Sequence, residues 1–340
     1  MIPATVKGVP VVSSELDRAE VYANWGSRWG IGRMSYTVEP GLYAIGSPDA
    51  ASPVLVTANY GLTFTRLRSS LPGFSAWILV VDTRGINVWC AAGRGTFSAE
   101  EVARQVEAAG LGEVVTHRTL ILPQLSAPGV TAREVRELTG FGAVFGPVRA
   151  EDIPAFVEAG MTATPEMRRV RFTFADRVSL TPLELVGGWK YLLGAALLML
   201  LLSGIGRAGY SGAGIVSIGL PSVGLLLLAY VAGTVVTPAL LPWVPGRAFS
   251  TKGALVGLVL AIAVAAHIVH HGGPMCTWPK VAAWMLLSPT VSSVLALLFT
   301  GSSTYTSLSG VVREMGLAAP LQIAGGVFGL MLWLAGAVGT

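Results

Sequence analysis

The sequence Ala76-Trp-Ile-Leu-Val-Val-Asp82 is an apolar run of β-strand length, and the fold of the N-terminal half can be worked out from it. An earlier run of the same kind, Pro53-Val-Leu-Val-Thr-Ala-Asn59, predicts another strand. Two shorter runs, Thr119–Leu122 and Ala143–Phe145, predict two more strands. The runs at 76–82, 119–122 and 143–145 are each followed by a predicted helix, so strands and helices are expected to alternate.

Helices are predicted in the intervals between and after these strands. Ser98 and Glu101 have the spacing of a capping box and open an amphipathic helix that continues through Ala109. Further helices are predicted over 131–139 and 152–159. Because strands and helices alternate with short turns, we expect an α/β doubly wound, mostly parallel sheet. Ligands of such sheets bind beyond the carboxyl ends of the strands.

The C-terminal half has a composition typical of membrane segments. The whole chain of 340 residues is 52% apolar and only 12% charged, against about 25% charged in soluble domains. Residues 1–187 carry 17 basic and 18 acidic residues, whereas residues 188–340 carry six basic and one acidic. The net charge of +4 therefore comes from the apolar half. The basic residues form no stripe with interleaved aromatics, so we expect no nucleic-acid partner.

Several apolar segments are long enough to cross a bilayer, which takes about 20 residues per helix. Five spans are predicted, over 188–205, 214–237, 253–271, 280–300 and 318–338, with four as the alternative count. Glycines spaced as Gly253 and Gly257 are typical of packed membrane helices. The expected organisation is an α/β domain over 1–165, a linker over 166–187 and an all-α transmembrane bundle of about five helices over 188–340.

The distribution of basic residues in the short loops predicts the orientation of these spans. Arg247, Lys252 and Arg313 lie on the same side of the bilayer as the N-terminal half, while Arg207 and Lys280 lie on the other side. Since Lys and Arg are in excess in cytoplasmic loops, we expect a multi-pass protein of the cytoplasmic (inner) membrane with its N-terminal domain in the cytosol.

One segment combines a cysteine with several glycines, Gly85-Ile-Asn-Val-Trp-Cys-Ala-Ala-Gly-Arg-Gly-Thr96. It follows a predicted strand, so Cys90 is expected at the carboxyl edge of the sheet. Arg94 and the next helix N-terminus could stabilise a thiolate there, and the glycines would let a bulky planar ligand approach the backbone. From the residues alone, a small buried cysteine packed beside Trp89 is an equally good interpretation.

The run Asn87-Val-Trp-Cys-Ala-Ala-Gly93 resembles the cap-helix motif of the mercury-methylating corrinoid membrane proteins, the HgcA family. The resemblance extends along essentially the whole chain and includes a corrinoid domain followed by a membrane bundle. Other segments that resemble the family are Trp29–Met34, Val38–Tyr43, Pro53–Tyr60, Leu122–Leu125, Ala127–Gly129 and Gly146–Arg149. The soluble half is also similar to the corrinoid domain of the corrinoid iron–sulfur protein of acetogens, which lacks the membrane part.

The resemblance implies a cobalamin-type corrinoid whose cobalt takes Cys90 as its lower axial ligand. Cys90 is then both the metal ligand and the catalytic residue. The residues implied to line the cofactor site are Cys90, Thr57, Asn59, Asn87, Val88, Trp89, Ala91, Ala92, Gly93, Pro123, Gln124 and Gly146.

The implied activity is corrinoid-dependent methyl transfer from a methyl-Co(III) corrinoid to inorganic Hg(II), which gives methylmercury. A thiolate is a soft, strongly donating ligand, and it favours departure of the methyl group with both bonding electrons. The spent cobalt must then be reduced. Because two cysteines cannot hold an iron–sulfur cluster, the resemblance implies a separate ferredoxin-like protein with two [4Fe–4S] clusters. It also implies a methyltetrahydrofolate-linked methyl donor.

The chain departs from the family pattern at two positions. Arg94 stands where the family usually has lysine after the cap glycine, and it keeps the charge without the flexible ammonium group. Gly61 stands where a lysine usually follows Ala-Asn-Tyr, so a side chain is lost. Both departures concern the efficiency of methyl transfer more than corrinoid binding.

Two alternative functions remain open at this point. A corrinoid methyl carrier of one-carbon metabolism would share the fold and the cofactor but use another acceptor. A membrane metal transporter or sensor is suggested by His267, His270 and His271, whose spacing allows one helix face, with Cys276 nearby. The more ordinary interpretation of these histidines is a polar cluster at a helix end.

Overall fold

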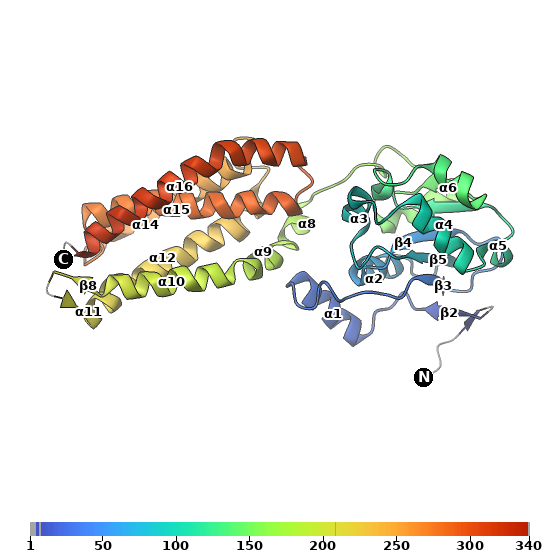
Figure 1. Cartoon of the computed structure of the whole chain (residues 1–340), viewed down its shortest axis with the longest axis horizontal. Coiled ribbons are helices and arrows are strands. Elements are labelled where there is room, and N and C mark those ends of the chain that lie inside the picture. Colours follow the sequence, from blue (N-terminus) through green and yellow to red (C-terminus); the bar gives the residue numbers. More distant parts are fainter. Residues whose placement is uncertain (1–4, 7, 208, 339–340) are drawn as a thin grey trace. The chain divides into compact units, whose positions relative to one another are not determined.

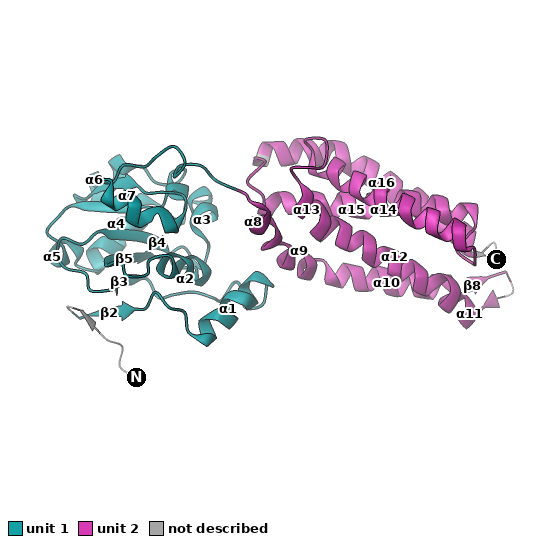
Figure 2. Ribbon diagram, turned by 180° about the vertical axis from the view of Figure 1, so that it is seen from behind, with its two compact units in different colours: residues 1–171 teal, residues 172–340 magenta. Residues whose placement is uncertain are grey.

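The computed structural model describes residues 5–6, 8–207 and 209–338 of the chain. It contains two compact units, Met1–Arg171 and Phe172–Thr340 (Figure 2). The first four and last two residues, which the expected domains include, lie outside the described residues. The expected linker over 166–187 is divided between the two units. Thr173 and Asp176 form a capping box that starts helix α8 (Phe174–Val178), and helix α9 (Thr181–Gly187) follows it. The second unit thus begins before residue 188.

The first unit is built on a seven-stranded sheet with the order β1-β2-β3-β5-β4-β6-β7 (Figure 1). The strands are β1 (Thr5–Val6), β2 (Val9–Val12), β3 (Gly41–Ile45), β4 (Val54–Ala58), β5 (Ala76–Val81), β6 (Thr119–Leu122) and β7 (Gly142–Phe145). The four predicted strands are confirmed as β4 to β7, and they pair in parallel. The first three strands were not predicted, and β3 is antiparallel to β5.

Helices cover both faces of this sheet, as a doubly wound arrangement requires. They are α1 (Arg18–Arg28), α2 (Gly61–Ser69), α3 (Val88–Arg94), α4 (Ala99–Ala108), α5 (Leu111–Val114), α6 (Ala132–Thr139) and α7 (Ile153–Glu158). Leu79 and Val81 of β5 belong to a buried cluster with residues of α3, α4 and α6. Ile78 and Val80 belong to a second cluster with residues of α2 and α7. This alternation along β5 places one hydrophobic core on each face.

Local capping explains where the predicted helices begin. The Ser98 hydroxyl accepts the Glu101 N–H at 3.3 Å, as expected. The Glu101 carboxylate does not complete the capping box, however, because it accepts the backbone N–H of Asp82 at 2.8 Å. That bond ties the end of β5 to the start of α4.

The second unit is helical. Its further elements are α10 (Trp189–Ser203), β8 (Ile205–Gly206), β9 (Gly209–Tyr210), α11 (Gly212–Gly214), the π-helical turn η3 (Ile215–Gly219), α12 (Leu220–Val231), the π-helical turn η4 (Ala232–Val236), α13 (Thr237–Leu240), α14 (Phe249–His271), α15 (Trp278–Leu298), the 3-10 turn η5 (Phe299–Ser302) and α16 (Leu308–Val338). Both π-helical turns come shortly before a proline, Pro221 or Pro238, which lacks the N–H needed to continue a regular helix.

Four stretches of helix are long and apolar enough to cross a membrane: Gly212–Leu240, Phe249–His271, Trp278–Ser302 and Ser309–Ala337. A fifth span is formed only if Phe174–Gly187 and Trp189–Ser203, which are bent by 52°, count as one. The helix expected from residue 318 begins at Leu308, so Arg313 and Glu314 lie in α16 and not in a loop. Glu314 helps to order this end, since its carboxylate accepts the Ser250 N–H of α14 at 2.6 Å.

Glycines allow α14, α15 and α16 to pack closely. A Cβ atom at Gly253 would lie 2.4 Å from the Ser292 carbonyl oxygen, and one at Gly257 would lie 2.6 Å from the Ser288 carbonyl oxygen. On the other side of α15, a Cβ at Gly325 would lie 2.4 Å from Oγ1 of Thr290. The predicted packing role of Gly253 and Gly257 is confirmed, and Gly325 has the same role, because no larger residue fits without moving the helices apart.

Candidate functional site

Cys90 lies in the first turn of the seven-residue helix α3. Asn87 is the N-cap of this helix, and its Oδ1 accepts the Cys90 N–H at 3.0 Å. Gly95 ends the helix in a left-handed conformation with φ of +75°. Cys90 is exposed, so the interpretation as a small buried cysteine is wrong. The segment between β5 and α4 thus forms a helix of its own and is not an irregular loop.

The two faces of α3 differ in exposure. Val88, Ala91 and Ala92 are buried against the sheet. Trp89, Cys90, Gly93 and Arg94 are exposed on the outward face, and a Cβ built at Gly93 would meet nothing within 4 Å. The outward face therefore offers a sulfur atom, a stretch of bare backbone and the side chain of Trp89, a residue that is 43% exposed.

Asn59 fixes the turn that leads into α3. It follows β4 and is buried. Its Oδ1 accepts the backbone N–H groups of Thr83 and Gly85, both at 3.0 Å, and the Thr83 hydroxyl at 2.9 Å. Its Nδ2 donates to Asp82 at 3.1 Å. Asn59 is therefore a positioning residue, because its side-chain oxygen is fully used within the chain.

Thr57 does not share a face with α3. It is buried in β4, opposite Val80 of β5 in the register. Val56 and Ala58 belong to the core beneath α3, whereas Leu55 belongs to the core beneath α2 and α7. Because strand residues alternate between faces, Thr57 lies on the side of Leu55. The structure therefore does not bring its side chain to the face that α3 covers.

The loops after β6 and β7 lie at the same edge of the sheet as α3. Pro123 precedes the 3-10 turn η1 (Gln124–Ser126), which contacts α3. The Gln124 side-chain oxygen accepts a hydrogen bond from Arg168 at 2.7 Å. The Gly146 N–H donates to the Leu122 carbonyl oxygen at 2.9 Å. The structure thus brings the loop after β6, with Pro123 and Gln124, beside α3, whereas Gly146 lies against Ile121 and Leu122 of β6.

Gly129, which was not among the predicted site residues, is required for this arrangement. A Cβ at Gly129 would lie 2.6 Å from the Ala92 carbonyl oxygen and 2.8 Å from that of Phe97. The loop after η1 therefore presses directly on the backbone at the end of α3. The signal that could have identified it was the motif Ala127–Gly129 among the segments that resemble the HgcA family.

A second missed feature is the segment that follows α1. The Gly61 N–H donates to the Tyr36 carbonyl oxygen at 2.8 Å, and a Cβ at Gly85 would lie 2.8 Å from the Thr37 side chain. This segment therefore runs along the carboxyl edge, where Ile31 and Met34 are 71% and 77% exposed. Large apolar side chains that face solvent at a sheet edge indicate a surface for a ligand or partner.

Tyr36 also explains one departure from the family pattern. A Cβ at Gly61 would lie only 2.7 Å from the Tyr36 ring. The space into which a lysine side chain would begin to extend is thus filled by an aromatic ring. Burial raises the pKa of the Tyr36 phenol above its usual value of about 10, because the charged form is poorly solvated there.

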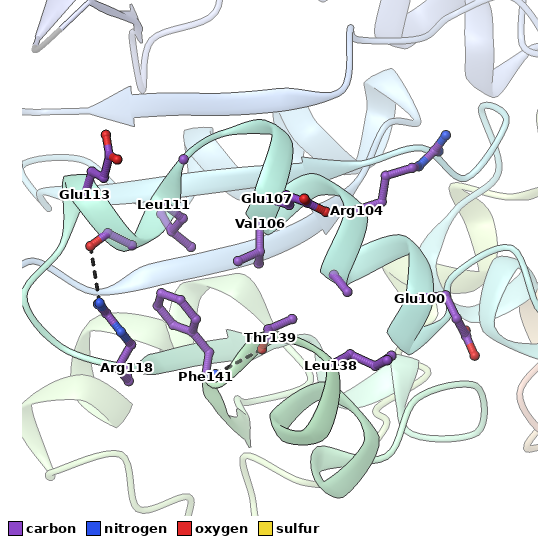
Figure 3. Close-up of a pocket in the computed structure, with 13 residues that line it drawn as sticks. Glu100, Arg104, Val106, Glu107, Leu111, Glu113, Arg118, Leu138, Thr139 and Phe141 are labelled. Atoms are coloured by element: carbon purple, nitrogen blue, oxygen red, sulfur yellow. Dashed lines mark hydrogen bonds between the residues drawn. The ribbon is translucent and has the colours of Figure 1, made fainter.

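A cavity of about 800 Å³ lies elsewhere in this unit, between α4, α5 and α6 (Figure 3). Arg118 donates to the Gly112 carbonyl oxygen at 3.3 Å, and its guanidinium lies 5.0 Å from the centre of the Phe141 ring. Both residues directly precede strands, so the cavity is at the amino edge of the sheet. The predicted site residues do not line it.

The histidines at the end of α14 contact one another. The His267 and His271 rings are 4.2 Å apart, and those of His270 and His271 are 4.8 Å apart, measured between centroids. In the part of the chain that the structure describes, no three or more His, Cys, Asp or Glu side chains are placed to hold a metal ion. The transporter or sensor hypothesis therefore gains no metal site from these residues.

Residues 31–157 match the family described as CO dehydrogenase/acetyl-CoA synthase delta subunit. Curated relatives include the acetyl-CoA decarbonylase/synthase complex subunit gamma of Methanopyrus kandleri, 37% identical over 128 residues, and that of Archaeoglobus fulgidus, 34% identical over 128 residues. Each alignment covers 37% of this chain and 27% of the relative. The subunit of Methanocaldococcus jannaschii is 37% identical over 116 residues, 34% of this chain and 23% of the relative.

The family match lies within the first unit. The resemblance to the corrinoid iron–sulfur protein is supported for this unit. The chain spans about a quarter of the length of these curated relatives. The matched range begins after α1 and runs from before β3 to the penultimate residue of α7, with α3 and Cys90 inside it.

Proposed function

We propose that this chain is a membrane-anchored corrinoid protein that catalyses methyl transfer to inorganic Hg(II), with Cys90 as the ligand below the cobalt. The observation that carries the proposal is the exposed thiol in the first turn of α3, at the carboxyl edge of the sheet. Ligands of open α/β sheets bind at this edge. The relatives among acetyl-CoA decarbonylase/synthase subunits support a role in one-carbon chemistry.

The described residues fit a wide, flat ligand on the outward face of α3. Gly93 leaves that face open, because a Cβ there would meet nothing within 4 Å. Trp89, Ile31 and Met34 supply exposed apolar surface at the same edge. A corrinoid ring that covered this surface would bury apolar area, which favours binding by about 25 cal/mol per Å².

The chain's own residues prepare the thiol for ligation. Asn87 holds the Cys90 N–H, and Asn59 holds the turn before it, so the sulfur is carried on a fixed backbone. Arg94, one turn after Cys90, adds a positive charge to the same face. A bound corrinoid would supply the methyl group, and a soft thiolate opposite that group favours its transfer as a carbanion equivalent.

A complete catalytic cycle of methyl transfer requires an electron donor and a methyl donor. Hg(II) receives the methyl group with both bonding electrons, and two electrons must then return before the next methylation. Cys90 and Cys276 are the only cysteines in the sequence, so we assign this reduction to a separate ferredoxin-like protein with two [4Fe–4S] clusters. A methyltetrahydrofolate-linked donor would supply the methyl group. The apolar helices would anchor the chain in the cytoplasmic membrane, with the first unit in the cytosol.

The second candidate function is a methyl carrier of one-carbon metabolism that uses another acceptor. The names of the curated relatives favour it. The two candidates share Cys90 and the corrinoid and differ only in the acceptor.

A methyl-acceptor assay distinguishes them. The chain, reconstituted with methylated corrinoid and reductant in detergent, would be given Hg(II) as a thiol complex, and methylmercury would be measured by gas chromatography and mass spectrometry. We expect methylmercury from the wild-type chain, background levels from Cys90→Ala, and wild-type levels from Cys276→Ala. A chain that binds and releases methyl groups but forms no methylmercury would overturn the mercury acceptor and favour the carrier.

A further inference from the structure

A groove of about 630 Å³ runs between α14 and α16, with α15 as its floor. Thr290 and Ser293 of α15 line its base, while Ala254 of α14 and Leu317 of α16 line its walls. It opens at the end of the bundle where α14 and α16 begin. Phe172, the first residue of the second unit, packs with Phe249 and Phe299 at this same end. The groove therefore opens on the side of the bilayer from which the chain enters the bundle.

The mouth of the groove carries excess positive charge. Arg247 and Arg313 both line it, and both are exposed. Within the described part of the chain, neither guanidinium has a hydrogen bond or an ion pair. Glu314 is the one acidic residue among the lining residues, and its carboxylate already accepts the Ser250 N–H at 2.6 Å. Two guanidinium groups are thus available to an anion at this position.

The deeper part of the groove is mainly apolar. Ala254, Leu317 and Leu321 line it along the two walls. Two of its polar side chains bond to each other, since Nε2 of Gln322 donates to the Ser293 hydroxyl at 2.9 Å. A ligand that fits both parts has an anionic head and an apolar tail.

We propose that this groove binds an anionic phospholipid, with its phosphate between Arg247 and Arg313 and an acyl chain along Ala254, Leu317 and Leu321. The walls of the groove belong to two of the helices that are apolar enough to span a membrane, so lipid is the surrounding medium. Basic pockets between membrane helices on the cytoplasmic side are typical sites for anionic headgroups. The arginines favour the phosphate because their planar fork can donate two hydrogen bonds to it.

The test uses the whole chain, delipidated in dodecyl maltoside and titrated with phosphatidylglycerol or with phosphatidylcholine of the same acyl chains. Native mass spectrometry counts the bound lipid. We expect phosphatidylglycerol to bind about tenfold more tightly than phosphatidylcholine. The double variant Arg247→Gln with Arg313→Gln removes this preference, whereas Arg207→Gln, in the hairpin between β8 and β9, leaves it unchanged.

Two further arms separate the lipid from a free anion. Ala254→Leu adds bulk to the wall of the groove without changing its charge, and we expect it to weaken phosphatidylglycerol binding. Inorganic phosphate at millimolar concentration is not expected to compete with phosphatidylglycerol for the groove. Equal affinity for the two lipids would overturn the proposal. The proposal would also be overturned if inorganic phosphate displaced the lipid and Ala254→Leu had no effect on lipid binding. That combined result would identify a simple anion site. If the double variant loses its helical circular dichroism, the Arg→Lys double variant, which retains both charges, is expected to keep the preference.

Discussion

The backbone N–H of Cys90 donates to Oδ1 of Asn87 at 3.0 Å, so the residue that begins α3 also fixes the backbone of the residue that carries the thiol. Asn59 fixes the preceding turn, because its Oδ1 accepts the N–H groups of Thr83 and Gly85. Two asparagines from separate loops therefore position one cysteine. The thiol is exposed, while the backbone that carries it is hydrogen-bonded to Asn87.

Replacing Asn87 with alanine removes the N-cap of α3. We expect a loss of about 1 kcal/mol in the stability of the helix, the usual cost of losing such a cap. Hydrogen exchange of the amides over 88–94 should accelerate, and corrinoid retention should fall. Asn87→Ser keeps a capping oxygen and should preserve both. Unchanged exchange in Asn87→Ala would show that the cap does not hold the helix.

Two glycines near the site should respond in opposite ways to alanine. Gly129→Ala places a Cβ within 2.6 Å of the Ala92 carbonyl oxygen, so we expect a destabilisation of about 1–3 kcal/mol. Gly93→Ala meets no atom within 4 Å and should raise helix stability by about 0.5–1 kcal/mol. It should nevertheless weaken corrinoid binding about tenfold, since the proposed corrinoid site lies on that bare backbone.

Thermal unfolding and corrinoid titration of both variants check this pair. If Gly93→Ala binds corrinoid as well as the wild type, the ring does not lie on this face of α3. If Gly129→Ala unfolds at the wild-type temperature, the loop after η1 can move away from α3 at little cost.

Tyr36 should make the first unit sensitive to alkaline pH. Burial raises the pKa of its phenol in the folded state, while the unfolded phenol ionises near a pH of about 10. The folded state therefore binds the proton more tightly, so stability is complete below about pH 10 and is lost as the pH rises further. Tyr36→Phe should reduce this loss. Its stability at neutral pH should not fall, because the Tyr36 hydroxyl is buried without a hydrogen-bond partner among the described residues, and its removal relieves a desolvation cost.

The thermal midpoint of both proteins, measured between pH 8 and pH 11, checks this expectation. Parallel curves for the wild type and Tyr36→Phe would mean that the phenol ionises as freely in the folded chain as in the unfolded one.

In the second unit, Gly253 should tolerate no large side chain. A Cβ there would lie 2.4 Å from the Ser292 carbonyl oxygen, so Gly253→Leu should separate α14 from α15 and lower stability by about 1–3 kcal/mol. Gly194 of α10 is a matched control, since a Cβ there meets nothing within 4 Å. Thermal unfolding in detergent should be lowered by Gly253→Leu and not by Gly194→Leu. Equal midpoints for the two variants would refute the close packing of α14 on α15.

The sequence predicted the elements whose signals are local. Thr119–Leu122 is a strand with the predicted bounds, and the helix that Thr131 caps ends at Gly140, where φ is +74°. Tertiary partners were beyond prediction. Glu101 has the spacing of a capping box, but its carboxylate bonds to Asp82 instead. Of the three missed strands, β2 and β3 depend on partners distant in sequence, as β3 does on β5, while β1 has only two residues.

For the candidate site, the sequence located the segment but not the orientation of its side chains. Cys90 could equally have been buried beside Trp89, and only the pattern of burial along α3 settles that the cysteine faces outward. Strand register decides on which side of the sheet Thr57 lies. The space beside Gly61 is filled by the ring of Tyr36, which comes from another segment of the chain. Neither can be read from spacing alone.

The absorption spectrum of the chain reconstituted with corrinoid shows whether the Cys90 sulfur lies beneath the cobalt. We expect the wild type and Cys276→Ala to give one spectrum, distinct from that of free corrinoid, and Cys90→Ala to shift it towards the free form. Identical spectra for the wild type and Cys90→Ala, at equal corrinoid occupancy, would contradict this placement.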